Sequence, residues 1–286
     1  MLPFIFWYLT ITLAGLAVFP LAYCMLPALP DRGYSISRAL GWLLWGYLFW
    51  LFTSLGISHN EMGGQLLALA MLLTLSGLAI RKIDFNEFRA WWRQRRGWIF
   101  SVEALFLAAF AGWAVVRAAN PLLNYTEKPM DLGFINAILR SPTFPPHDPW
   151  LSGYAISYYY FGHILVAMLA QITGVPGSVA FNLGIALVFG LSAAGVYGLV
   201  YNLLNVFRPS LSAARSAILA LFGPIFALLM GNLEGLLDVL HARGLFWQTT
   251  DAGEKFSPFW RWLDIVDLNM PPVQVGEWPS RPGWWW

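Results

Sequence analysis

Acids, tyrosines and a histidine are concentrated in one stretch of the sequence, residues 126–163. Within it, Glu127 and Asp131 stand four residues apart with a proline between them. Such a carboxylate could act as a general base on an acceptor hydroxyl or amine, or hold a divalent cation (Mg²⁺ or Mn²⁺) against a phosphate. The alternative is that Asp131 caps a helix and Glu127 is a solvated loop acid.

A second group of candidate residues begins at Asp148, which precedes Pro149. An aspartate N-cap with proline at the first helical position is a common helix start, so we expect a helix over Trp150–Thr173. Residues 158–160 are three consecutive tyrosines, which would point in three directions on such a helix.

On this predicted helix, Tyr154 and Tyr158 share one face, and Tyr159 and His163 share another. A tyrosine–histidine face could bind a sugar ring or a phosphate. The alternative is an aromatic belt at the membrane interface with hydrogen-bonded tips, which would include Tyr160. His163 is more typical of a hydrogen-bonded helix histidine than of a metal ligand, because no second histidine stands at ligand spacing.

These side chains must be held by helices in a membrane. Hydrophobic residues make up 58% of the 286 and charged residues 11%, whereas soluble proteins average roughly 45–50% and 25%. Several runs approach the ~20 apolar residues that cross a bilayer, and the alternation of a β-barrel is missing. We therefore expect an all-α, multi-pass membrane protein. The net charge of +2 gives no indication of nucleic-acid binding, and the single Cys24 indicates neither a disulfide framework nor a thiolate metal site.

Six apolar segments are predicted to span the membrane, at about Leu2–Leu26, Ala39–Ile57, Gln65–Ile80, Ile99–Val116, Val179–Leu204 and Ala217–Met230. The first lacks the basic start of a signal peptide, so we treat it as retained. The connection 81–98 carries six arginines and lysines, and the positive-inside rule places it in the cytoplasm. Alternation then delivers residues 118–153 to the extracytoplasmic face.

Within that external segment, Leu132, Ile135 and Leu139 recur at helical spacing. They predict a short amphipathic helix from Asp131 to about Ser141, lying in the membrane interface.

The helix predicted over Trp150–Thr173 leaves two topologies open. If it crosses the membrane, Arg208 and Arg215 fall outside. If it returns to its own side, both fall inside. We favour the returning helix because it satisfies the charge rule throughout.

Residues 231–286 are rich in tryptophan and mixed in polarity, which is typical of a membrane interface. Glu234 and Asp238 are one helical turn apart and could supply a second carboxylate pair facing the first. An amphipathic interfacial helix without chemistry is the alternative.

Several motifs in order resemble one family. TEKPMD, FPPHDPWLSGY, SYYYFGH, MGNLEG and SRPGWWW resemble the YYY family of large multi-pass membrane proteins, named for the tyrosine triplet. The resemblance extends over residues 125–286, and because family members are longer, we expect the chain to be an N-terminal portion. The family is in turn similar to the GT-C membrane glycosyltransferases, which take sugars from polyprenyl-phosphate donors.

This resemblance implies roles for individual residues. The first large external loop of GT-C enzymes carries an acid before an amphipathic helix, then a Pro-Pro motif, then a tyrosine-rich juxtamembrane helix. Asp131, residues 145–146 and the tyrosine triplet follow in that order. Asp131 is thus implied to be the catalytic acid or base, with Glu127 as its nearest substitute, and Glu234 would stand near the second external acidic site. GT-C enzymes often show adjacent acids, whereas here the two are separated.

The same resemblance implies that Arg140 or a divalent cation neutralises the leaving phosphate, and that Trp150 and Tyr154 stack on the sugar. The candidate substrate-binding residues are therefore Arg140, Asp148, Trp150, Tyr154, Tyr158, Tyr159, Tyr160, His163 and Glu234. The implied domains are N-terminal membrane helices (1–98), a GT-C-like helical bundle with its external loop (99–230) and a tryptophan-rich segment (231–286).

The implied function is sugar transfer from a polyprenyl-phosphate donor on the extracytoplasmic face of the cell membrane. The expected partners are the lipid bilayer and this donor, and nothing indicates the oligomeric state. Two rivals are a transporter or lipid-handling protein, which would need polar residues lining a path through the membrane, and a scaffold whose tryptophan-rich tail docks partners.

Overall fold

A computed structural model describes residues 1–123, 127–230, 233–251, 253–266, 268–272 and 275–276, without the side chain of Glu234. The chain divides into two compact units, Met1–Ile225 and Phe226–Trp286. Each unit is described by itself below.

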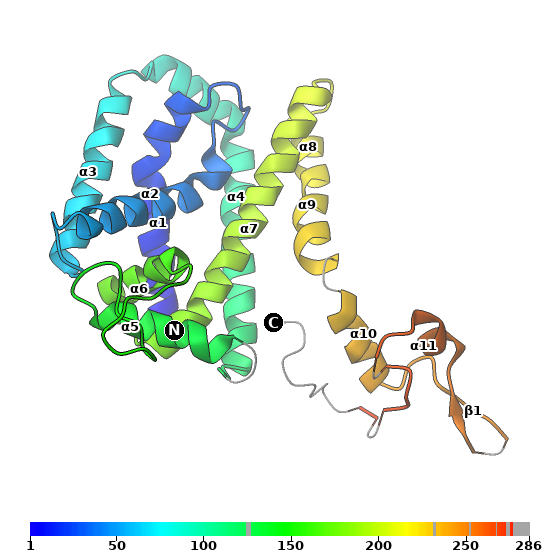
Figure 1. Ribbon diagram of the computed structural model, residues 1–286. Coiled ribbons are helices and arrows are strands. Elements are labelled where there is room, and N and C mark those ends of the chain that lie inside the picture. Colours follow the sequence, from blue (N-terminus) through cyan, green and yellow to red (C-terminus); the bar gives the residue numbers. More distant parts are fainter. Residues whose placement is uncertain (124–126, 231–232, 252, 267, 273–274, 277–286) are drawn as a thin grey trace. The chain divides into compact units, whose positions relative to one another are not determined.

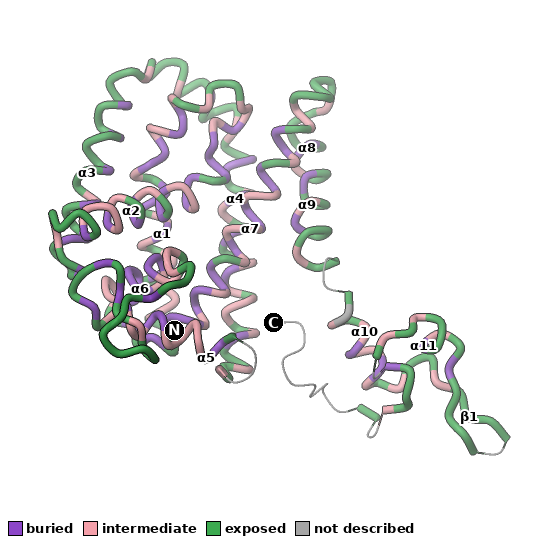
Figure 2. The backbone as a smooth tube through the Cα atoms, viewed as in Figure 1, coloured by how far each residue is buried: buried purple, intermediate pink, exposed green. Residues whose placement is uncertain are grey.

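The first unit consists of helices (Figure 1). Four of them are long and apolar enough to cross a membrane: α1 (Leu2–Met25), α3 (Met62–Ile80), α4 (Phe85–Ala119) and α7 (Gly177–Phe207). The shorter elements are the 3₁₀ turn η1 (Tyr34–Ile36), α2 (Ser37–Ser54), α5 (Lys128–Arg140), α6 (Phe161–Thr173), α8 (Ala213–Ala220) and α9 (Phe222–Pro224). The π turn η2 (Ile225–Leu229) begins at the last residue of this unit and continues into the second. Exposed stretches run along the outer helices (Figure 2). On α3 they carry leucines and methionines, as expected for a surface in contact with lipid.

Helices α4 and α7 form a long antiparallel pair (Figure 1). Trp98, in the first half of α4, stacks on Tyr201 near the end of α7, with ring centroids 3.6 Å apart. At the other end, Arg117 of α4 donates to the side-chain oxygen of Asn182 of α7. Helix α7 therefore begins on the side of the bundle where α4 ends.

The described residues that connect α4 to α7 in the sequence stay on the side of the bundle where α4 ends, because α6 does not cross the bundle. The hydroxyl of Thr173, its last residue, accepts a hydrogen bond from Trp7 near the start of α1, at 3.0 Å. Asn60, just before α3, donates to carbonyl oxygens at the end of α5. Helices α1, α3 and α7 thus begin on one side, which we call the α5 side. This arrangement agrees with the returning topology favoured from the charge rule, with Arg208 and Arg215 on the opposite side.

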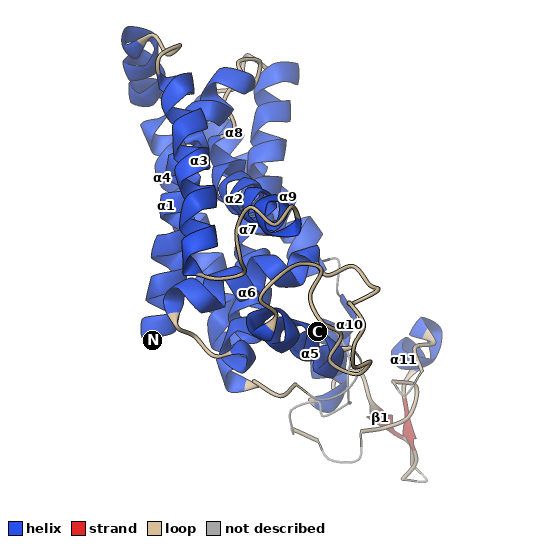
Figure 3. Cartoon of the chain, turned by 60° about the vertical axis from the view of Figure 1, so that its left-hand side comes forward, coloured by secondary structure: helices blue, strands red, loops and turns tan. Residues whose placement is uncertain are grey.

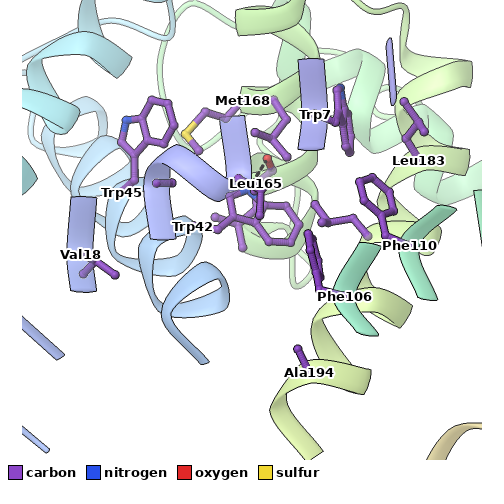
Figure 4. Close-up of a cluster of buried hydrophobic side chains, with 14 of the residues drawn as sticks. Trp7, Val18, Trp42, Trp45, Phe106, Phe110, Leu165, Met168, Leu183 and Ala194 are labelled. Carbon is purple, nitrogen blue, oxygen red and sulfur yellow. Dashed lines mark hydrogen bonds between the residues drawn. The ribbon is translucent and has the colours of Figure 1, made fainter. Parts of the chain in front are cut away.

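Helix α2 crosses α1 at very close range. A Cβ atom on Gly41 would lie 2.3 Å from the backbone oxygen of Ala14, so the crossing requires glycine. Further along α2, Trp42 donates to the carbonyl oxygen of Leu165 in α6 at 3.1 Å, and a Cβ atom on Gly46 would lie 2.0 Å from the Leu165 side chain. Figure 4 shows this contact within the buried apolar cluster. Helix α2 therefore holds α6 in place.

One ion pair joins α2 to α4 inside the apolar bundle. Arg38, buried in the first turn of α2, donates from both terminal nitrogens to the carboxylate of Glu103. The Tyr34 hydroxyl donates to the same carboxylate at 2.8 Å, and Arg38 Nε reaches Thr12 of α1 at 3.3 Å. Burial and the negative charge of Glu103 raise the pKa of Tyr34, so that its hydroxyl remains a donor. Arg38 and Glu103 thus form a bidentate ion pair with additional hydrogen-bond donors, which is the geometry that compensates for the desolvation of charged groups.

The helix predicted over Trp150–Thr173 is wrong at its start, because α6 begins only at Phe161. Asp148 does accept the N–H groups two and three residues on, each at 2.8 Å. The turn does not continue, since Gly153 takes a φ of +85° and the chain folds back on itself. The tyrosines 158–160 therefore lie in an irregular segment.

Three expectations about the spans are also corrected. The segment 81–98, predicted as a loop, is helical from Phe85, because Asp84 caps the helix by accepting the N–H group two residues on at 2.8 Å. Two predicted spans, 39–57 and 217–230, are not among the four candidates found in the described residues. Helix α2 is too rich in tryptophan and glycine, and the later segment is broken into α8, α9 and η2.

The second unit contains α10 (Leu233–Ala242), an antiparallel hairpin of β1 (Gln248–Thr249) and β2 (Lys255–Phe256), and α11 (Pro258–Leu263) (Figure 3). Trp260 is fully buried, and its indole donates to the carbonyl oxygen of Leu245 at 2.9 Å. The ring of His241 meets the edge of Trp260 at 5.2 Å. Trp260 is thus a core residue of this unit, not an interfacial anchor as its composition suggested.

The ion pair yields a stability prediction. Replacing Glu103 alone with leucine leaves the Arg38 guanidinium buried without its counter-charge, which costs about 3–5 kcal/mol for a broken buried pair. The double variant Arg38→Met/Glu103→Leu removes both charges and should recover most of that loss. Thermal unfolding of the purified protein in lipid nanodiscs, followed by tryptophan fluorescence, measures both. Equal destabilisation of the single and double variants would contradict the role given to the pair.

Candidate functional site

Helix α5 presents the first predicted acid. Its apolar residues Phe134, Ile135 and Ile138 are buried; of the three residues on which the amphipathic prediction rested, Ile135 is buried, whereas Leu132 and Leu139 are only partly buried. A Cβ atom on Gly177 would lie 2.3 Å from the side-chain oxygen of Asn136, so α5 packs directly on the first turn of α7. This contact fixes the rotation of α5 about its axis, and therefore which of its side chains stay accessible to a ligand.

On that face, Asp131 is paired with His163. The distance between Asp131 Oδ1 and His163 Nε2 is 3.0 Å, and the two side chains are 30% and 14% exposed. The other ring nitrogen of His163 is enclosed and has no partner among the residues that the structure describes. The histidine can therefore orient the carboxylate, which keeps its second oxygen for a substrate proton.

Aromatic rings frame this pair. Phe134 lies edge-to-face with His163 at 5.3 Å, and it also contacts Trp150 at 5.6 Å and Tyr158 at 5.7 Å. Trp150 covers Gly133, where a Cβ atom would lie 2.8 Å from the indole. Since Trp150 and Tyr158 are 62% and 39% exposed, they form an open rim that suits stacking against a sugar ring.

A tyrosine donor also lies close to the acids. The Tyr158 hydroxyl donates to that of Tyr159 at 2.6 Å. This hydrogen bond is the main reason that the pKa of Tyr158 is raised to about 12; partial desolvation and the negative charges of Glu127 and Asp131 add to it. Glu127 itself is exposed, and its carbonyl accepts the N–H of Asp131 at 2.9 Å. At neutral pH, Tyr158 is therefore uncharged, and its hydroxyl proton is engaged by Tyr159.

Other candidates are not brought to this pair. Arg140 is nine residues beyond Asp131 on α5, which is about 13 Å along the helix axis. The Tyr160 hydroxyl accepts from a tryptophan of α2 at 3.4 Å, Asp148 is engaged by its own turn, and Tyr154 is 64% exposed. The helical faces predicted for the tyrosines do not exist, because these residues precede α6.

The divalent cation considered for the Glu127 and Asp131 carboxylates stays a hypothesis. Among the described residues, no three His, Cys, Asp or Glu side chains gather in a group that could hold a metal ion. The side chain of Glu234 lies outside the described residues, and its pairing with Asp238 stays a prediction.

Two polar groups of the membrane helices escaped the sequence analysis. Glu103 is the one acid within the predicted span 99–116, and that isolation was the available signal. Arg117, at the end of α4, is 2% exposed, and its position just after an apolar run gave no sign of burial. The pairing of Asp131 with His163 had no sequence signal either.

Comparison with known proteins identifies the family. The model of a family described as "Uncharacterized membrane protein (DUF2298)" matches residues 44–286. No curated protein and no solved structure matches the chain. Together with the four candidate spans, the match over most of the chain shows that this integral membrane protein belongs to the DUF2298 family.

Proposed function

We propose that the protein transfers a sugar from a polyprenyl-phosphate donor at the α5 side of the membrane, with Asp131 as the general base. The observation that carries this proposal is the Asp131–His163 pair within an open aromatic rim. The resemblance of the surrounding motifs to the YYY family, and of that family to GT-C glycosyltransferases, supports the choice of donor.

The reaction uses groups described above. The free oxygen of the Asp131 carboxylate takes the proton of an acceptor hydroxyl, whose oxygen attacks the anomeric carbon of the sugar. The bond between that carbon and the phosphate oxygen breaks, and the lipid phosphate leaves. His163 Nε2 holds the carboxylate in place, and the exposed faces of Trp150 and Tyr158 stack on the sugar.

The charge distribution supports an extracytoplasmic site. The side opposite α5 carries the arginine-rich start of α4 and the connection after α7, with Arg81, Arg89, Arg93, Arg95, Arg96, Arg208 and Arg215. Under the positive-inside rule, this side is cytoplasmic. The α5 side then faces outward, where lipid-linked sugars would present their head groups.

The function is tested by donor consumption. The intact protein, purified with lipid, is incubated with a panel of radiolabelled polyprenyl-phosphate sugars beside Asp131→Asn. General-base catalysis contributes about 10²–10⁴-fold, so we expect turnover to fall by at least about a hundredfold in the variant. Asp84→Asn is the matched control, because it makes the same change in an exposed helix cap of α4 that an amide can replace.

Each outcome has a definite meaning. If the wild-type protein consumes no donor of the panel, the transferase function is wrong, and transport or scaffolding takes its place. If turnover survives in Asp131→Asn, the enzyme stands but the base is another residue, with Glu127 tested next.

His163 is predicted to act by positioning Asp131. His163→Leu removes a hydrogen bond to a carboxylate worth about 1.5–3 kcal/mol, which corresponds to roughly 10–100-fold in kcat, with KM for the donor little changed. His163→Gln keeps an N–H donor and should recover part of the rate. A kcat that falls equally in both variants would argue against positioning by this hydrogen bond.

A further inference from the structure

Two cations on the α5 side are buried without acidic partners. Arg117, in the last turn of α4, is 2% exposed, and Lys128, the first residue of α5, is 8% exposed. Within the described part of the chain, neither forms an ion pair with a carboxylate. Burying charge without compensation is costly, so their retention calls for a counter-ion.

The environment of each cation is known. Arg117 Nε and Nη2 both donate to the side-chain oxygen of Asn182, at 2.9 and 2.7 Å. A neutral amide oxygen satisfies hydrogen bonds but does not cancel the charge. The pKa of Lys128 is lowered first by burial and then by the positive charge of Arg117. The charge of Arg117 thus adds to burial in disfavouring the charged form of Lys128.

A cavity of about 310 Å³ opens beside Arg117, between the end of α4 and the start of α7. Its polar lining is Arg117, Asn182 and Ser178. Ser178 is the second residue of α7, and no described side chain caps the start of that helix. The first N–H groups of a helix are unpaired and carry partial positive charge, which favours an anion. The volume lies at the lower end of small-molecule sites, roughly 300–1,000 Å³.

The surroundings of the cavity are apolar. Val115 and Leu122, from the end of α4 and just beyond it, are 68% and 59% exposed, and Val179, which lines the cavity, is 38% exposed. At the end of a membrane-spanning pair, such side chains face lipid tails. The occupant therefore carries an anionic group for the cavity and an apolar tail for the helix surface beside it.

We propose that Arg117, Asn182 and Ser178, which line this cavity, bind the phosphate group of a membrane lipid there, and that the charge of Lys128 strengthens this binding. Lys128 and Asp131 are one turn apart on α5, where residues three apart are neighbours. The bound phosphate would thus lie near the proposed base. That this lipid is the sugar donor rests on the proposed function, whereas the binding of a lipid phosphate does not.

The test measures binding directly. The intact protein in a phosphate-free maltoside detergent is titrated with a polyprenyl monophosphate, with the corresponding polyprenol and with inorganic phosphate, and bound lipid is quantified by native mass spectrometry. We expect the polyprenyl monophosphate to bind, and the polyprenol to bind at least about tenfold more weakly, since hydrogen bonds to charged groups contribute enough for that ratio.

The variants separate binding from folding. Lys128→Met removes a buried charge that makes no described hydrogen bond, so the melting temperature should hold or rise while affinity for the polyprenyl monophosphate falls at least about tenfold. Arg117→Gln should lose a similar factor. Arg208→Gln, which removes an exposed cation on the opposite side of the bundle, is the matched control and should bind normally.

Contrary outcomes are distinct. Equal binding of polyprenol, or undiminished binding by Lys128→Met, would overturn the lipid-phosphate site. Displacement of the lipid by inorganic phosphate at similar concentration would show a free-anion site instead. Lipid-phosphate binding without sugar transfer would support the site and contradict the proposed function. Sugar transfer that continues in Lys128→Met with an unchanged KM for the donor would support the proposed function and contradict the site.

Discussion

The pair of the buried Arg38 and the partly exposed Glu103 is the interaction on which the first unit depends. It fixes the start of α2 against α4, and through Thr12 against α1. Helix α2 then receives α6, because Trp42 donates to the Leu165 carbonyl. Helix α6 in turn places its first residues, His163 among them, opposite α5. A charge pair in the middle of the bundle thus determines, through two helix contacts, where the imidazole at one end lies.

Helix α5 combines two environments within one turn. Lys128 is held in a buried position beside Arg117, while Asp131 stays partly accessible and is oriented by an imidazole. The close contact of Asn136 with Gly177 prevents α5 from rotating about its own axis, so that Lys128 and Asp131 keep these two environments. An acid and a cation with opposite exposures, fixed on a rigid element, form a site that can distinguish two parts of one amphipathic ligand.

Local patterns predicted the elements better than the contacts between them. The spacing of apolar residues in α5 was sufficient, because amphipathic periodicity is a property of the segment itself. The segment before α6 was not predictable by the same means, since Asp148 forms the same hydrogen bonds whether a helix follows or only a turn, and Gly153 decides between them. The Asp131–His163 pair joins residues 32 apart, and only the packing of α5 against α6 brings them together.

The separation of Arg38 and Glu103 along the chain, 65 residues, constrains how the protein enters the membrane during synthesis. Arg38, in the first turn of α2, would enter the bilayer without its counter-charge, where an unpaired charged side chain is costly, and α2 is not among the described helices apolar enough to cross by themselves. When α2 leaves the ribosome, its partner helix has not yet been made. We therefore expect α2 to stay at the membrane surface or packed against α1 until α4 is inserted. Helix α2 then reaches its final position only after α4 is in the membrane.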